Sequence, residues 1–159
     1  MKIGIANDHA GVALKKEVVE HLEMQGHEVI NFGTDTLDSV NYPDYGKKVG
    51  QAIVSNEIDL GILICGTGLG ISIAANKVKG VRAACVSEAT SAHLAREHNH
   101  CQIIAFGARI VAGELAKDIV DSFINAKPME GRHTQRVALI GQIEEETSFE
   151  LDSVSCGIE

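Results

Sequence analysis

The chain has 159 residues, 45% of them hydrophobic and 23% charged, which suits one globular domain with a buried core. The 22 acidic residues outnumber the 14 lysines and arginines, and the resulting net charge of −8 excludes a basic nucleic-acid interface. No stretch approaches the roughly 18 apolar residues of a membrane span, and the N-terminus has a strand pattern instead of a leader pattern. We therefore expect a cytoplasmic protein that binds neither nucleic acid nor membrane.

Apolar runs and amphipathic segments alternate along the chain. The periodicity predicts five strands, at residues 2–6, 27–32, 59–65, 81–86 and 101–106. It predicts a helix after each strand, at 10–22, 44–55, 69–77, 89–97 and 113–125, and a last helix at about 134–146. The run 59–65 is apolar throughout, which is typical of a strand covered on both faces.

Five strand–helix repeats with short connections predict an α/β fold, in which a parallel sheet lies between two helix layers. Ligands of such folds bind at the carboxyl ends of the strands, so functional residues should follow strands. We expect one domain over residues 1–147. The tail over 148–159 shows no periodicity and is expected to be loosely ordered.

The most informative motif follows the third predicted strand and reads Cys65-Gly66-Thr67-Gly68-Leu69-Gly70. Its glycines leave backbone N–H groups accessible at a helix N-terminus, where an anion is favoured, although a tight strand-to-helix turn would explain them as well. The spacing fits neither a dinucleotide fingerprint nor a P-loop, because Ile71 follows Gly70. An arginine would also be needed at position 71 for a cysteine-phosphatase loop. A thiol beside a set of free amides remains.

A helix N-terminus stabilises a thiolate, and a thiolate beside amide donors can remove a proton while the amides hold the oxyanion that forms. A buried, inert thiol is the alternative for any single cysteine. Cys85 and Cys101 lie inside predicted strands and fit that alternative. The four cysteines, which include Cys156, form no C-x-x-C pair, so no zinc ribbon or thioredoxin-like motif is present.

Other polar residues occupy predicted strand and helix ends. Asp8 and His9 follow the first strand, and Asp8 could also serve only as a helix N-cap. A polar run at 96–100 precedes the fifth strand, and Arg109 follows it. Arg132 and Arg136 share one helix face and could hold a phosphate, or could be ordinary solvated residues. We expect these residues to gather on one rim with Cys65, where they suit proton transfer on a small phosphorylated substrate.

The chain resembles the type B ribose-5-phosphate isomerases and the related galactose-6-phosphate and allose-6-phosphate isomerases. The resemblance covers residues 1 to about 145. It rests on the segments Asp8-His9-Ala10-Gly11, Tyr42-Pro43-Asp44-Tyr45, residues 61–72 (GILICGTGLGIS), Ala74-Ala75-Asn76-Lys77, His98-Asn99 and Gly131-Arg132-His133 with Arg136. Asn7 and the tail beyond Glu146 depart from the family pattern without touching these segments.

The resemblance implies a Rossmann-like α/β/α sandwich with a five-stranded parallel sheet and no metal or nucleotide cofactor. It also implies a homodimer or dimer of dimers whose site lies at the subunit interface, so that His98 and Tyr42 serve the neighbouring subunit. Cys65 would move the proton between C1 and C2, Thr67 would assist it, and His98 would open the furanose ring. The remaining roles would be sugar binding by Asp8, enediolate binding by Gly66, Gly68, Leu69 and Gly70, phosphate binding by His9, Arg132 and Arg136, and completion of the pocket by Tyr42, Asn99 and Arg109.

The function that this resemblance implies is aldose–ketose isomerisation of D-ribose 5-phosphate and D-ribulose 5-phosphate in the non-oxidative pentose phosphate pathway. A six-carbon sugar phosphate, allose 6-phosphate or galactose 6-phosphate, is the alternative substrate. Since the galactose enzymes divide their site residues between two unlike subunits, a complete set in one chain favours the ribose substrate. A non-catalytic sugar-phosphate sensor is a further alternative, although binding alone requires neither Cys65 nor His98.

Overall fold

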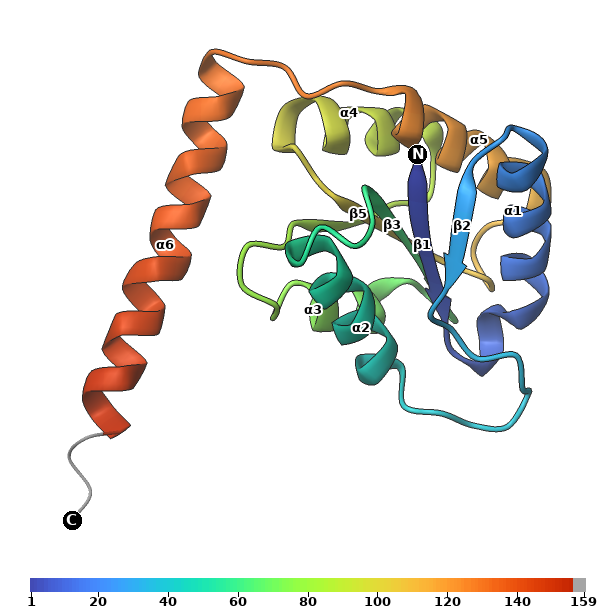
Figure 1. Cartoon of the computed structure of the whole chain (residues 1–159), viewed down its shortest axis with the longest axis horizontal. Helices are drawn as coiled ribbons and strands as arrows, with labels where there is room; N and C mark the ends of the chain where they lie inside the picture. Colours follow the sequence, from blue (N-terminus) through green and yellow to red (C-terminus); the bar gives the residue numbers. More distant parts are fainter. Residues whose placement is uncertain (156–159) are drawn as a thin grey trace.

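The computed structural model describes residues 1–155 of the chain, which form a parallel five-stranded sheet between helices (Figure 1). The strands are β1 (Lys2–Asn7), β2 (Glu28–Asn31), β3 (Leu60–Cys65), β4 (Ala83–Cys85) and β5 (Ile103–Gly107), in the spatial order β2-β1-β3-β5-β4. The helices are the 3₁₀ turn η1 (His9–Gly11), α1 (Val12–Met24), α2 (Tyr42–Val54), α3 (Leu69–Ala75), α4 (Ala89–Asn99), α5 (Gly113–Asn125) and α6 (Arg132–Ser155). The predicted three-layer α/β fold is confirmed.

The sheet is covered on both faces, which explains the continuous apolar runs of its strands. On one face, Ile3, Ile62 and Phe106 pack against α1, α4 and α5. On the other face, Leu63 and its neighbours pack against α2 and α3. Because side chains alternate along a strand, Cys65 belongs to the second face, together with Leu63. Its side chain is thereby aimed toward α3.

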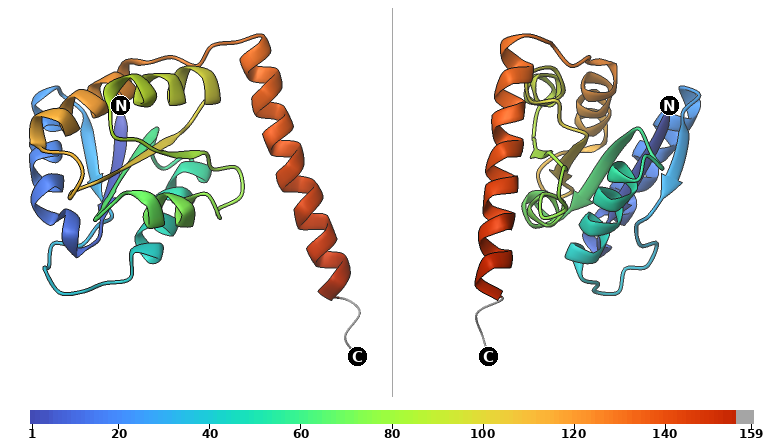
Figure 2. Two further views of the ribbon diagram at one scale, coloured as in Figure 1. Left: turned by 180° about the vertical axis from the view of Figure 1, so that it is seen from behind. Right: turned by 60° about the vertical axis from the view of Figure 1, so that its left-hand side comes forward.

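The last helix differs most from its prediction. It begins at Arg132 and continues to Ser155, beyond the predicted end near Glu146, so most of the segment expected to be loosely ordered is helical. Residues 156–159, including Cys156, lie outside the described residues. Figures 1 and 2 show that α6 stands beside the sandwich instead of covering the sheet. Among the α6 residues up to 147, Leu139, Ile140 and Ile143 have exposed apolar side chains.

Candidate active site

The Cys65 thiol lies at the carboxyl end of the central strand β3 and is only 5% exposed. The chain turns directly after it into α3, and the backbone N–H of Gly68 donates a hydrogen bond to Cys65 Sγ over 3.1 Å. The Gly68 N–H and the N-terminus of α3 therefore both direct partial positive charge toward the sulfur. The geometry therefore supports Cys65 as a base.

Glycine is required at two positions of this loop. Gly68, the N-cap of α3, has a φ of 82°, and a Cβ there would lie 2.8 Å from the backbone of Phe106. A Cβ on Gly70 would lie 2.7 Å from the ring of Tyr42. The loop is thus closely packed between β5 and the first turn of α2, and Tyr42 lies over its amides.

Arg109 reaches the same loop from the end of β5. Its backbone N–H donates to Gly66 O over 3.1 Å, and a Cβ on Gly66 would lie 3.2 Å from its guanidinium. Thr67 is exposed, and its Oγ1 accepts a 3.4 Å hydrogen bond from the N–H of Leu69, whose side chain is also exposed. The loop therefore presents amides, a hydroxyl and a guanidinium beside the thiol. A hollow of about 360 Å³ opens next to it, and its lining residues are Thr67, Leu69, Cys85, Val86, Ser87 and Ile110.

Asp8 and His9 join this group from the neighbouring strand. The Asp8 N–H donates to Ile64 O over 3.1 Å, which fixes Asp8 next to the end of β3. Its carboxylate caps η1 by accepting from the N–H of Ala10, so the capping role is real. His9 Nδ1 accepts a 3.4 Å hydrogen bond from Val40, which leaves Nε2 as the proton-bearing nitrogen of the neutral ring and as a donor toward an anion.

Two buried residues that the sequence reasoning missed hold this part of the site. Asn7, fully buried, donates to the carbonyls of Asp8 and Thr34 over 2.8 and 3.0 Å. Lys15, which is 4% exposed, donates to Thr34 O over 2.8 Å and pairs with Asp35 over 2.5 Å. Together they tie the loop after β2 to the end of β1. The available sequence signal was Lys15 itself, a charged residue on the apolar face of a predicted helix.

A second group of predicted residues gathers around His98, in the last turn of α4. The His98 ring stacks on the ring of His133, with centroids 4.2 Å apart and an interplanar angle of 10°. The Glu97 carboxylate lies 3.7 Å from His98 Nε2. Arg132 Nε donates to His133 Nε2 over 3.4 Å, and Arg136 follows one helical turn later.

His133 had no predicted role, although it lies within the motif Gly131-Arg132-His133. It is only 5% exposed. Burial lowers the pKa of His133, and the nearby His98, Arg132 and Arg136 lower it further. A neutral His133 can accept the Arg132 hydrogen bond and support the His98 ring without adding a third positive charge to this cluster.

The expectation that all these residues share one rim is wrong for a single chain. Because α4 runs back across the parallel sheet, its C-terminal end lies near the amino ends of the strands. Arg82, just before β4, accordingly donates to the carbonyls of Asn99 and His100. We call Asp8, His9, Tyr42, residues 65–70 and Arg109 the thiol half-site. The expectation that Tyr42 serves the neighbouring subunit is wrong, because the start of α2 places its ring beside Gly70 of its own chain. We call His98, Asn99, Arg132, His133 and Arg136 the imidazole half-site, which lies at the opposite end of the strands.

The other cysteines are only partly as predicted. Cys101 is buried, and burial raises its pKa to about 11, so the expectation of an inert thiol is confirmed. Cys85 is exposed, and its expected burial is wrong, because β4 is a short edge strand that ends at this residue. Partial burial of the sulfur and the proximity of Cys65 nevertheless raise the pKa of Cys85. Neither thiol is set up as a base.

Residues 1–155 contain neither a cluster of metal-ligating side chains nor a helix that could span a membrane. No group of three or more histidine, cysteine or acidic side chains in this range is arranged to hold a metal ion. No helix within the same residues has the length and apolar character needed to cross a membrane.

Comparisons with known proteins identify the family of the chain. The model of the family described as Ribose/Galactose Isomerase matches residues 3–140. Ribose-5-phosphate isomerase B of Escherichia coli (strain K12) is 51% identical over 144 residues, which are 91% of this chain and 97% of that protein. Among solved structures, the Clostridium thermocellum ribose-5-phosphate isomerase B has a TM-score of 0.91 and 53% identity, with 92% of this chain and 99% of that chain covered.

A further solved structure, ribose-5-phosphate isomerase B from Mycoplasma genitalium with bound ribulose-5-phosphate, has a TM-score of 0.87 and 41% identity. The match covers 91% of this chain and 97% of that chain. These similarities extend over both half-sites and over nearly the full length of the relatives. The chain therefore belongs to the ribose/galactose isomerase family.

Proposed function

We propose that the chain is an aldose–ketose isomerase that interconverts D-ribose 5-phosphate and D-ribulose 5-phosphate through an enediolate. The single observation that carries this function is the Cys65 thiol, buried at the N-terminus of α3 with the Gly68 amide on its sulfur. The relative with bound ribulose-5-phosphate supports the five-carbon substrate. The pathway would be the non-oxidative pentose phosphate pathway, in the cytoplasm.

The isomerisation moves one proton between adjacent carbons. The Cys65 thiolate takes the proton from C2 of the open-chain aldose, the electron pair of that bond forms the C1–C2 double bond, and O1 becomes the oxyanion. Backbone N–H groups of the 66–70 loop would hold this oxyanion, because the N-terminus of a helix favours an anion. The thiol then returns its proton to C1 while the O2 proton moves to O1, which gives the ketose and regenerates the thiolate.

Ring opening and phosphate binding fall to the imidazole half-site. The His98 imidazole would take the proton from the O1 hydroxyl of the furanose and deliver one to the ring oxygen, so that the C1–O4 bond breaks. Arg132 and Arg136, four residues apart on α6, would bind the phosphate together with His9 of the thiol half-site. Arg109 of the same half-site would help to complete the pocket. Asp8 would bind the sugar hydroxyls, and Tyr42, Thr67 and Asn99 would complete the pocket.

A complete site needs both half-sites, and we propose that a homodimer supplies them. A two-fold axis that seats the imidazole half-site of one subunit on the thiol half-site of its partner generates two identical sites at once. Exposed apolar residues beside each half-site support such an interface. These are Leu69, Ile73 and Ile110 near the thiol loop, and Leu139, Ile140 and Ile143 on α6.

Replacement of Cys65 tests the proposed chemistry directly. We expect Cys65→Ala to lower kcat for ribose 5-phosphate by at least about a hundredfold, since general-base catalysis contributes about that factor or more. Exchange of the C2 proton with deuterated solvent, followed by NMR, should be lost in parallel. Cys85→Ala serves as the matched control, because Cys85 is a second thiol beside the same loop and has no role in the proposed reaction. Unchanged turnover in Cys65→Ala would remove the proposed base.

Two assays distinguish this function from its alternatives, a comparison of substrates and a measurement of proton exchange with solvent. We expect kcat/KM for ribose 5-phosphate to exceed the values for allose 6-phosphate and galactose 6-phosphate, and the reverse order would assign a six-carbon substrate. Saturable sugar-phosphate binding without solvent exchange at C1 or C2 would instead indicate a sensor.

A further inference from the structure

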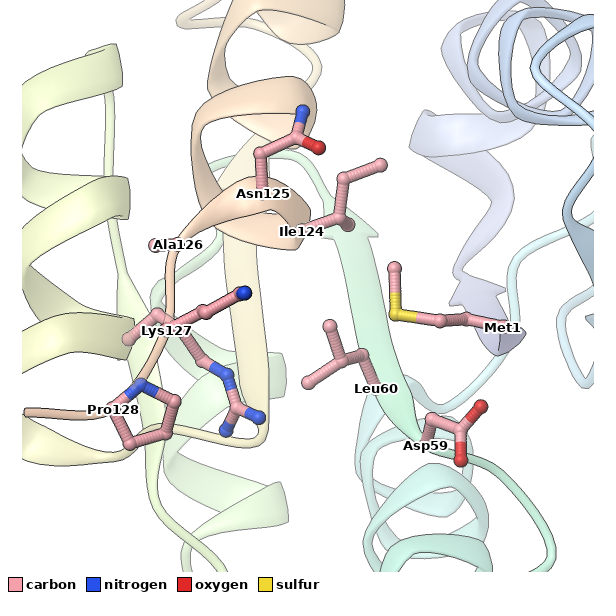
Figure 3. A pocket seen from close by; sticks show the side chains of 9 residues that line it. Met1, Asp59, Leu60, Ile124, Asn125, Ala126, Lys127 and Pro128 are labelled. Atoms are coloured by element: carbon pink, nitrogen blue, oxygen red, sulfur yellow. The ribbon is translucent and has the colours of Figure 1, made fainter.

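A cavity of about 360 Å³ lies at the amino ends of the strands, at the end of the sheet opposite Cys65 (Figure 3). Its volume is in the usual range for small-molecule sites. Apolar groups form much of its wall, and two basic side chains and one carboxylate lie among them. The lining residues are Met1, Asp59, Leu60, Arg96, Ile124, Asn125, Ala126, Lys127 and Pro128.

The basic residues of this cavity lack negative partners. Arg96 Nη1 donates to Cys101 O over 3.1 Å, but Arg96 Nε is buried and has no hydrogen-bond partner. No ion pair within residues 1–147 involves Arg96 or Lys127. Burial lowers the pKa of Arg96, and the nearby Arg82 guanidinium lowers it too. A half-buried guanidinium without a counter-charge is costly, and an anion beside it would offset that cost.

The carboxylate in the cavity does not provide that counter-charge. Asp59 Oδ2 accepts a 2.7 Å hydrogen bond from the backbone N–H of Lys2, and Asp59 makes no ion pair with Arg96 or Lys127. Figure 3 shows Asp59 at one edge of the cavity, while the Lys127 side chain extends into it from the segment that follows α5. Leu60 lies between them, and Leu60 and Ile124 are apolar residues of the cavity wall.

We infer that this cavity binds a small organic acid, whose carboxylate pairs with Arg96 and Lys127 and whose apolar body packs on Leu60 and Ile124. A guanidinium binds a carboxylate with two parallel hydrogen bonds, which favours this anion over a spherical one. The cavity shares no lining residue with either half-site of the isomerase. Its occupancy therefore does not depend on the proposed function, and its ligand need not be a sugar phosphate.

The test uses phenylacetate and its neutral isostere phenylacetamide as probes on the full-length protein. We expect phenylacetate to shift the methyl NMR signals of Leu60 and Ile124 saturably. Phenylacetamide should bind at least about tenfold more weakly, because it lacks the charge that the guanidinium recognises. Absence of a saturable shift at these methyl groups, or equal affinity for the two probes, would overturn the inference.

Substitutions assign the basic partners. Arg96→Gln and Lys127→Gln should each weaken phenylacetate binding by about threefold to tenfold. Lys127→Gln keeps the test decisive if loss of the Arg96–Cys101 hydrogen bond impairs folding. Lys16→Gln, an exposed lysine of α1, is the matched control and should leave the affinity unchanged. Phenylacetate could instead bind in the active site. In that case it would inhibit isomerisation competitively and Lys127→Gln would leave its affinity unchanged, which would refute the proposal.

Discussion

Two inactive variants should regain activity when they form mixed dimers, because the two half-sites of one chain lie at opposite ends of the sheet. Cys65→Ala removes the proposed base from the thiol half-site, and His98→Ala removes the proposed ring-opening group from the imidazole half-site. In a mixed dimer, one site receives an intact Cys65 from one subunit and an intact His98 from the other. The second site receives both substitutions and stays inactive.

The expected magnitude follows from this geometry. When equal amounts of the two variants assort freely, half of the dimers are mixed, and each has one intact site out of two. About a quarter of all sites should then be active, so the specific activity should return to about 25% of the wild-type value. Co-expression with two different tags, purification on both tags and a ribose 5-phosphate assay would measure this directly, with about 50% expected for the purified mixed dimer.

A mixture of wild type with the doubly substituted chain provides the reciprocal control. If the half-sites are shared, every mixed dimer is inactive, and only the dimers of two wild-type chains are active. An equal mixture should then have about a quarter of the activity of a sample with the same total number of chains, all of them wild type. If each subunit formed its own site, about half would remain. Native mass spectrometry would verify that mixed dimers had formed. A verified mixed dimer of the two single variants without activity would refute the shared site.

Three further predictions follow from particular contacts. Lys15→Met should lower the free energy of unfolding by about 1–3 kcal/mol and raise KM, because Thr34 and Asp35 lose their buried donor. The control Lys16→Met should change the free energy of unfolding by less than about 0.5 kcal/mol. Equal effects of the two substitutions in chemical denaturation would contradict the role of Lys15. Gly26 has a φ of 83° and open space around it, so Gly26→Ala should lower the free energy of unfolding only through backbone strain, by about 1–2 kcal/mol. Gly68→Ala should lower it by at least about 1 kcal/mol more, because the new methyl group would meet β5, and should also lower kcat/KM. Since the pKa of His133 is lowered in the folded state, the unfolded state binds the proton first as the pH drops, and wild-type stability should fall below the ordinary histidine pKa of 6.5. Melting curves between pH 7.5 and 5 should show a smaller fall in stability for His133→Gln than for the wild type. An unchanged slope would contradict a neutral, buried His133.

Most of the fold could be predicted from the chain because strand and helix periods differ and because Gly and polar residues separate the elements. The prediction of 113–125 matches α5, and the strand predicted over 59–65 differs from β3 by one residue at its start. The end of α6 was missed because its mostly polar sequence gives little amphipathic signal. Burial of Cys85 was misjudged because an apolar strand pattern does not distinguish an edge strand from a central one.

Part of the candidate site likewise follows from the sequence, and part follows only from the tertiary structure. The sequence by itself determined that a thiol, a glycine loop and a helix N-terminus lie together, since all three come from adjacent residues. Only the tertiary structure decided that His98, Arg132 and Arg136 lie at the other end of the sheet, because that depends on the direction in which α4 recrosses it. Asn7, Lys15 and His133 also required the structure, since their roles arise from packing between segments that are distant along the chain.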